Sequence, residues 1–274
     1  MPDRAELTAV RRPLDAEAVS RKLVDRGSAW PAPETVSTVE STNAAVADAA
    51  RKGAPEGLVL VAEEQTSGRG RLDRSWSSPA GAGLTLSVLL RPAPPSGTWG
   101  WLPILAGLAL LDAVRTLSDV DATLKWPNDL LLGPAQAKGA GILAESGDGA
   151  VVVGIGLNVS TTADELPLGA TSLLLEGAVL SRELLLVELI LALESRYIAW
   201  TRAGGDAEAS ALQRDYRKAC ATLRRAVVVQ LPSGGELRGT AEAIEPSGGL
   251  QVRTVDGTLT TVVAADVVHV RAGQ

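Results

Sequence analysis

The pattern of the chain changes near residue 222, and this change limits the folds that the chain can adopt. After Leu223 the sequence alternates Val, Leu and Thr with Pro-Ser-Gly-Gly and Asp-Gly turns. Short alternating segments separated by such turns are typical of antiparallel strands joined by hairpins. The sequence therefore predicts a separate C-terminal domain over residues 222–274, folded as a small antiparallel β-barrel or meander.

Residues 35–221 mix strands and helices and predict one larger α+β domain. Short apolar segments bounded by Gly or Pro predict strands, and longer segments with helical periodicity predict helices. The expected strands are 35–39, 58–62, 84–90, 123–126, 130–132, 141–144 and 150–155, and the expected helices are 42–52, 100–117, 181–200 and 207–219. Ahead of this domain, residues 1–34 form a short extension with one expected helix over 15–26.

The composition excludes several kinds of site. The chain carries 26 basic and 32 acidic side chains, so a general electrostatic attraction to nucleic acid is not expected. A single Cys and a single His leave no disulfide framework and no His/Cys metal site. A Ser-His-Asp triad would need His269, a lone His on a predicted strand, which is more often structural.

The chain also lacks the signals of export or membrane insertion. Its N-terminus has no apolar signal core, and the longest apolar runs, 102–111 and 184–193, are too short to span a bilayer. We therefore expect a cytoplasmic protein that does not associate with a membrane.

Residues 68–76 read Gly-Arg-Gly-Arg-Leu-Asp-Arg-Ser-Trp and stand out in an otherwise neutral or acidic chain. Arginine presents a rigid fork of N–H donors that matches carboxylates and phosphates, and glycine lets the backbone approach a ligand closely. The stretch, called the arginine loop below, therefore predicts a cover over an anionic small molecule. Taken alone, it would more often be a solvated basic turn.

Two glycine pairs resemble nucleotide-binding motifs without completing them. Asp73 stands where the pair beginning at Gly68 needs its third glycine, and Val159 stands there for the pair beginning at Gly154. The sequence Gly-x-x-x-x-Gly-Lys-Ser/Thr does not occur, so a P-loop is excluded. A nucleotide site in this chain must be of another kind.

Five polar blocks lie at predicted strand ends or helix starts. Each block alone has an ordinary explanation: Ser41 would be a helix cap, Asp129 a turn residue and Lys138 a solvated charge. Strand ends in a sheet-based fold can converge on one face, so their joint occurrence favours a common site. The blocks are 41–43, 64–71, 125–129, 138–145 and 154–159.

At these blocks the chain strongly resembles the biotin protein ligases, and it is similar to bacterial, actinobacterial-type members. The resemblance runs from about residue 35 to the C-terminus. It implies a mixed, mostly antiparallel sheet with helices packed on one face, like the cores of class II aminoacyl-tRNA synthetases, and a C-terminal SH3-like β-barrel. It also implies two steps. Biotin and Mg-ATP form biotinyl-5′-adenylate, which then acylates a lysine of the biotin carboxyl carrier protein domain of an acyl-CoA carboxylase.

The resemblance also assigns roles to individual residues. The biotin contacts would be Ser41, Thr42, Asn43, Gln65, Arg69, Gly70, Arg71 and Lys138. The contacts with ATP and the adenylate would be Arg71, Arg74, Trp76, Lys125, Asn128 and Asn158. The catalytic residues would be Lys138, Arg69, Arg71 and Asp129.

The reaction suits these residue types. Its first step brings a carboxylate to the α-phosphorus of ATP, so the site needs fixed positive charge and in-line positioning. Mg²⁺ would add charge on the phosphates, with Asp129 as its expected contact. In the second step the carrier lysine, with an ordinary pKa of about 10.4, must lose a proton, and Asp129 is also the residue expected to orient or accept it.

Two further expectations concern departures from the family. Asp73 stands in the arginine loop where glycine is usual, which adds a carboxylate and a Cβ where backbone freedom is expected. The residues ahead of the first strand are too few, and not basic enough, for the winged helix-turn-helix of some members. We therefore expect no DNA binding.

Two alternatives stay open from the sequence. A lipoate–protein ligase shares the fold and the adenylation chemistry, although the arginine loop and the block 125–129 favour biotin. A nucleic-acid-binding module could be built from the C-terminal barrel and the basic loop. The acidic net charge and the lack of an aromatic stacking platform argue against this second alternative.

Overall fold

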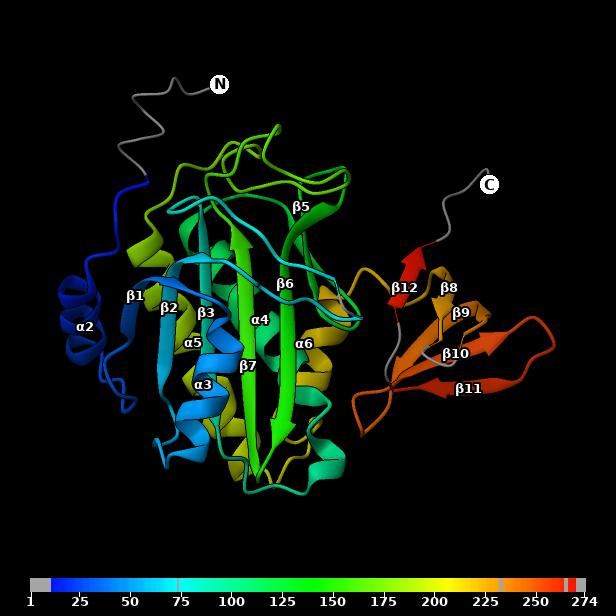
Figure 1. Cartoon of the computed structure of the whole chain (residues 1–274). Helices are drawn as coiled ribbons and strands as arrows, with labels where there is room; N and C mark the ends of the chain where they lie inside the picture. Colours follow the sequence, from blue (N-terminus) through cyan, green and yellow to red (C-terminus); the bar gives the residue numbers. More distant parts are fainter. Residues whose placement is uncertain (1–10, 73, 232–233, 264–265, 270–274) are drawn as a thin grey trace.

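The structure is a computed structural model that describes residues 11–72, 74–231, 234–263 and 266–269 (Figure 1). Within these ranges, seven strands form the larger sheet: β1 (Glu34–Val39), β2 (Val59–Gln65), β3 (Gly83–Leu90), β4 (Ala122–Lys125), β5 (Asp129–Leu132), β6 (Ala137–Gly147) and β7 (Ala150–Asn158). Their order is β1-β2-β3-β7-β6-β5-β4. β1 and β2 are parallel and the other neighbours are antiparallel, which confirms the expected mixed, mostly antiparallel sheet.

Helices lie on both faces of this sheet. Figure 1 shows α3 in front of the sheet, and α4 and α5 behind it. The helices are α2 (Ala16–Asp25), α3 (Thr42–Arg51), α4 (Trp101–Leu117), α5 (Arg182–Arg202) and α6 (Leu212–Ala219), with a short 3-10 helix η1 over Ser96–Thr98.

The alternation of side chains along β2 explains these two layers. Val59 and Val61 belong to the main core with α4 and α5, whereas Leu58 and Leu60 pack in a second cluster with Val46 of α3. A strand that is apolar on both faces must be covered on both faces. Helices were expected on one face of the sheet only. That expectation was incomplete, because α3 covers the opposite face.

The last helix of the first domain begins later than the expected range 207–219, because α6 starts at Leu212. Asp206 Oδ1 accepts hydrogen bonds from the backbone N–H groups of Glu208 and Ala209, at 2.8 and 3.0 Å. These bonds make a capped turn. Ala211 then adopts a φ of 66°, in the left-handed region, so the regular helix cannot begin before residue 212.

The second sheet is antiparallel throughout and confirms the expected C-terminal β-unit. In the described ranges it has the order β11-β10-β9-β8-β12. Its strands are β8 (Ala226–Gln230), β9 (Glu236–Ile244), β10 (Leu250–Thr254), β11 (Leu259–Val262) and β12 (Asp266–His269). The division of the chain at residues 34 and 221 stays a prediction.

Trp126 connects the second sheet to the first through hydrogen bonds. Its backbone N–H donates to Thr222 Oγ1 at 3.0 Å, and its indole Nε1 donates to the carbonyl of Gly248 at 3.1 Å. Thr222 Oγ1 also lies 3.0 Å from His269 Nε2. Burial, with smaller contributions from Lys125 and Arg225, lowers the pKa of His269 to about 4, so the ring is neutral at pH 7. His269 therefore contributes to the contact between the two sheets through Thr222.

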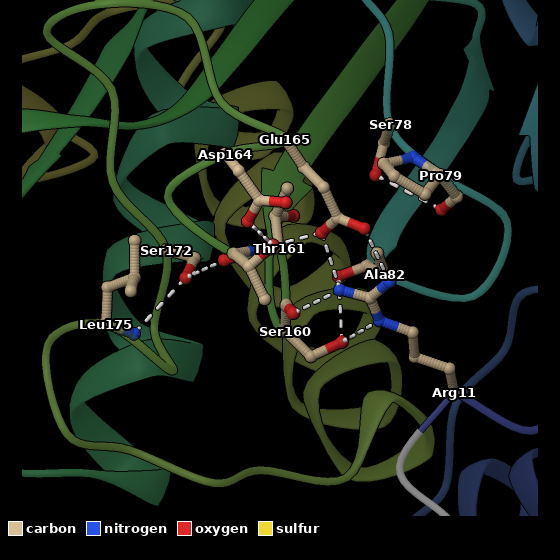
Figure 2. A network of polar contacts seen from close by, with 11 residues as sticks. Arg11, Ser78, Pro79, Ala82, Ser160, Thr161, Asp164, Glu165, Ser172 and Leu175 are labelled. Carbon is tan, nitrogen blue, oxygen red and sulfur yellow. Dashed lines mark hydrogen bonds and ion pairs between the residues drawn. The ribbon is translucent and has the colours of Figure 1, made fainter. Parts of the chain in front are cut away.

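The segment before α2 is anchored by an arginine. Arg11 makes a two-pronged contact with the Glu165 carboxylate, at 2.9 and 2.7 Å, and donates to the carbonyl of Ser160 at 2.7 Å (Figure 2). Ser160 and Glu165 lie in the segment after β7, which continues to Gly169 and Thr171. The backbone N–H of Lys138 donates to the carbonyl of Gly169, and the backbone N–H of Thr171 donates to the carbonyl of Lys138. The loop anchored by Arg11 therefore also borders Lys138.

No helix in the described residues is long and apolar enough to cross a membrane.

Candidate functional site

A cavity of about 220 Å³ lies where α3 begins, β2 ends and the arginine loop crosses the sheet. Figure 1 shows this loop running from β2 across β7 and β6 toward the second sheet. Every residue predicted for the site lines the cavity except Asn158. The lining residues that were predicted are Ser41, Thr42, Asn43, Gln65, Arg69, Gly70, Arg71, Arg74, Trp76, Lys125, Asn128, Asp129 and Lys138.

One end of the cavity is lined by neutral hydrogen-bonding groups. Ser41 caps α3 by accepting from the backbone N–H of Ala44, which places the next two residues against the sheet. Gln65 Oε1 accepts from the backbone N–H and the hydroxyl of Thr42, at 2.7 and 2.9 Å. These bonds fix the Gln65 amide and leave its NH₂ group as a donor. Such an end suits a neutral polar ring rather than an ion.

Ser87 lies beneath these groups and was not predicted from the sequence. It is fully buried on β3, and its hydroxyl lies 2.8 Å from Thr42 Oγ1 and 2.6 Å from Asn43 Oδ1. A buried hydroxyl needs a partner, so a single serine within the apolar strand Gly83–Leu90 was an available signal.

The arginine loop is folded as a small hairpin over the cavity. Gly70 N–H donates to the carbonyl of Arg74 at 2.6 Å, and Trp76 N–H donates to the carbonyl of Gly68 at 2.8 Å. A Cβ on Gly68 would overlap the Trp76 carbonyl, so the loop needs glycine there for its close approach. Asp73 lies outside the described residues, and its expected effect on the loop stays a prediction.

Cations gather at the other end of the cavity. Lys138 Nζ lies 2.7 Å from Asp129 Oδ1, and Arg74 pairs with Asp266. Burial lowers the pKa of Lys125, an effect that Asp129 opposes and Lys138 reinforces. Burial likewise lowers the pKa of Arg71. Buried cations with lowered pKa values gain most from an anion placed between them.

Trp76 forms a wall of the cavity against two glycines. Its indole lies over Gly156 of β7 and is also close to Gly141 of β6, where the absence of side chains makes room for the ring. The Trp76 Nε1 is buried and has no hydrogen-bond partner among the described residues. The sequence had placed the glycine pair beginning at Gly154 in one of the five blocks expected at the site, although it fails as a nucleotide motif, and the structure gives Gly156 a steric role.

The two asparagines of the predicted nucleotide contacts differ. Asn128 lines the cavity, although its amide donates to the carbonyl of Ile142 at 2.8 Å and so also fixes the turn before β5. Asn158 is buried away from the cavity lining and donates to the carbonyl of Thr171 at 2.9 Å. The structure therefore does not bring Asn158 together with the other predicted residues.

The second sheet supplies part of the wall, which the sequence did not predict. Two of its strands contribute lining residues: Asp266, Val267 and Val268 from β12, and Gln230 from β8. No local motif marks these residues, because their position depends on how the second sheet docks. In the described part of the chain no group of three or more His, Cys, Asp or Glu side chains could hold a metal ion.

Comparisons with known proteins found two family models and several relatives that match the chain. Residues 36–161 match the biotin/lipoate A/B protein ligase family, and residues 222–270 match the biotin protein ligase C terminal domain. The chain is 41% identical to the biotin–[acetyl-CoA-carboxylase] ligase of Mycobacterium tuberculosis, over 99% of this chain and 100% of that protein. It is 31% identical to the bifunctional ligase/repressor BirA of Bacillus subtilis, over 84% of this chain and 71% of that protein.

A solved structure shares the fold. The biotin protein ligase from Aquifex aeolicus in complex with biotin and ATP superposes with a TM-score of 0.72 at 24% identity, over 88% of this chain and 99% of that one. The two matched family models, the relative matched along its whole length and the shared fold lead to one conclusion: the chain belongs to the biotin/lipoate A/B protein ligase family, as a biotin protein ligase.

Proposed function

We propose that this ATP-dependent biotin ligase joins biotin to one lysine of the carrier domain of an acyl-CoA carboxylase, by way of biotinyl-5′-adenylate. The observation that carries the proposal is a single cavity with a neutral hydrogen-bonding end and a cationic end. Biotin has the same two ends, an uncharged ureido ring and a carboxylate. A lipoate ligase, the alternative from the sequence, would not need the fixed amide and hydroxyl groups around Thr42 and Gln65.

The neutral end would hold the ureido ring. Thr42 holds the Gln65 carbonyl oxygen, so the Gln65 NH₂ group would donate to the ureido carbonyl. The arginine loop would then close over the ligand and exclude water, which strengthens every charge interaction beneath it.

The cationic end would bring the two anionic reactants together. Lys138 and Arg71 would stabilise the carboxylate and the α-phosphate as the carboxylate oxygen attacks phosphorus and pyrophosphate leaves. The Trp76 ring would pack against the adenine. The position of Asn158 gives no support to the adenine contact expected for it.

The acidic groups of the cavity fit Mg²⁺ only as an ion that arrives with the nucleotide. Mg²⁺ retains waters and takes its ligands from one or two carboxylates and from phosphates. Asp129 lines the cavity and is balanced by Lys138 at 2.7 Å, so it would be the protein contact. When bound, the ion supplies positive charge on the phosphate oxygens.

In the second step the carrier lysine would attack the carboxyl carbon of the adenylate. A C–N bond forms, the bond from that carbon to the phosphate oxygen breaks, and AMP leaves. Asp129 would orient the amine and accept its proton. We further propose a cytoplasmic location and no DNA binding, in line with the composition and charge of the chain.

Biotin-dependent exchange of pyrophosphate into ATP tests the first step. We expect exchange with biotin and none with lipoate, and the reverse result would establish the alternative. Asp129→Asn then separates the two roles of that residue. Equal loss of adenylation and of transfer from preformed adenylate indicates the metal contact, whereas selective loss of transfer indicates the base.

A further inference from the structure

A continuous chain of hydrogen bonds runs from the neutral end of the cavity to the arginine loop. Gln65 accepts from the backbone N–H of Thr42, Thr42 Oγ1 lies 2.8 Å from the Ser87 hydroxyl, and Ser87 donates to Asn43 Oδ1. From Asn43 it continues to Glu145, at 2.7 Å, and Glu145 Oε2 also accepts from Arg69 Nη2 at 3.3 Å. The chain therefore connects the proposed biotin end with the first arginine of the cover.

Asn43 is fully occupied by protein groups. Its NH₂ group donates to Glu145 Oε2 and to the carbonyl of Leu143, at 2.7 and 3.2 Å, and its carbonyl oxygen lies 2.6 Å from the Ser87 hydroxyl. A Cβ on Gly154 would overlap the Asn43 amide, so the amide is also held sterically. With both N–H groups in use, Asn43 serves to fix its neighbours more than to bind a ligand.

Glu145 is the neighbour that this fixed amide holds. Its Oε2 accepts from the buried Asn43 and from the half-exposed Arg69, so one carboxylate oxygen joins a buried group to the arginine loop. Exposed ion pairs contribute little to the stability of a fold. Arg69 lines the cavity, and its contact with Glu145 uses only one of the five N–H groups of its guanidinium.

We propose that Glu145 is a positioning residue that holds the Arg69 guanidinium over the cavity in its ligand-binding orientation. The proposal deepens the function given above and depends on it. An arginine held in place loses less conformational entropy when it meets the acyl-adenylate, so the bound intermediate should leave the site more slowly.

The release rate of biotinyl-adenylate tests this role. Adenylate is formed from labelled biotin and ATP on the full-length enzyme, excess unlabelled biotin and ATP are added, and loss of label is followed. We expect Glu145→Gln to release adenylate about tenfold faster than the wild type. The melting temperature without ligand should stay unchanged, because the ion pair with Arg69 is exposed and the new amide oxygen can still accept from Asn43. A purely structural role would instead lower the melting temperature.

A double-mutant cycle shows whether Glu145 acts through Arg69. Arg69→Ala alone should also speed release, and adding Glu145→Gln to it should have no further effect. Asp148→Asn is the matched control, because it removes a carboxylate from the exposed tip of the same hairpin. This control should release adenylate at the wild-type rate.

Two results would overturn the positioning role. One is a wild-type release rate in Glu145→Gln, and the other is an equal acceleration by Glu145→Gln with and without Arg69. In both cases the wild type still forms adenylate, so the proposed function stands. If the wild type showed no biotin-dependent pyrophosphate exchange, the proposed function itself would be wrong, and the role of Glu145 would fail with it.

Discussion

The Trp76 indole lies so close to Gly156 that a Cβ on residue 156 would come within 2.7 Å of Trp76 Cζ2. Real Cβ atoms do not approach that closely, so the ring keeps its place only while residue 156 is glycine. Two segments far apart in the sequence thereby shape one wall of the cavity.

Gly156→Ala should displace Trp76 and weaken nucleotide binding. Because the ring packs where we place the adenine, the KM for ATP should rise at least about tenfold, while the KM for biotin changes much less. Steady-state pyrophosphate exchange at varied ATP and varied biotin measures both constants. Gly147→Ala, which places its methyl group in open space, is the control and should leave both constants unchanged.

Lys138→Ala should nearly abolish adenylate formation. Removing one fixed cation from the reacting centre should lower kcat by about 10²–10³-fold, as the loss of an oxyanion-stabilising donor does elsewhere. Single-turnover formation of labelled adenylate measures the rate. Lys52→Ala removes an exposed lysine at the end of α3 and should behave as the wild type. A fast Lys138→Ala enzyme would place this lysine outside the reaction.

Asp266→Asn should loosen the arginine loop, because Asp266 of the second sheet pairs with Arg74 of the loop. Limited trypsin digestion should cut after the loop arginines several-fold faster than in the wild type, with a matching rise in the KM for ATP. Asp256→Asn, at an exposed turn of the same sheet, serves for comparison. Equal digestion of wild type and Asp266→Asn would show that the loop does not depend on the second sheet.

Glu165→Gln should remove part of the acid sensitivity of the fold. Arg11, the largest cause, lowers the pKa of Glu165 from 4.5 to about 2 (Figure 2). A lowered pKa stabilises the folded state above the unfolded value, and that stability is lost as the pH falls through the folded value. The wild type should therefore be more stable than Glu165→Gln at pH 6, and the gap should close between pH 4.5 and about 2.

Urea unfolding at a series of pH values measures this gap. Glu17→Gln, which changes an exposed glutamate of α2, is the control. A constant gap between wild type and Glu165→Gln down to pH 2 would contradict the role of the Arg11 contact.

The local elements could be predicted because short-range rules decide them. Ser41 caps α3 through its own hydroxyl, the strands follow alternation and turn signals, and the arginine loop is marked by its glycines. The predicted start of the last helix at residue 207 was wrong, because Asp206 accepts hydrogen bonds from the next backbone N–H groups and forms a turn ahead of α6. The family resemblance came from the order and spacing of such local blocks.

The sequence by itself determined the two kinds of sheet, the arginine loop and thirteen of the residues that line the cavity. Only the tertiary structure decided that Asp266 reaches the cavity from the second sheet, that Ser87 and Glu145 link the neutral end of the cavity to the arginine loop, and that Asn158 turns away toward Thr171. The physical reason is that a side chain's partners depend on how sheets and loops pack across long sequence distances, and no local pattern encodes that packing.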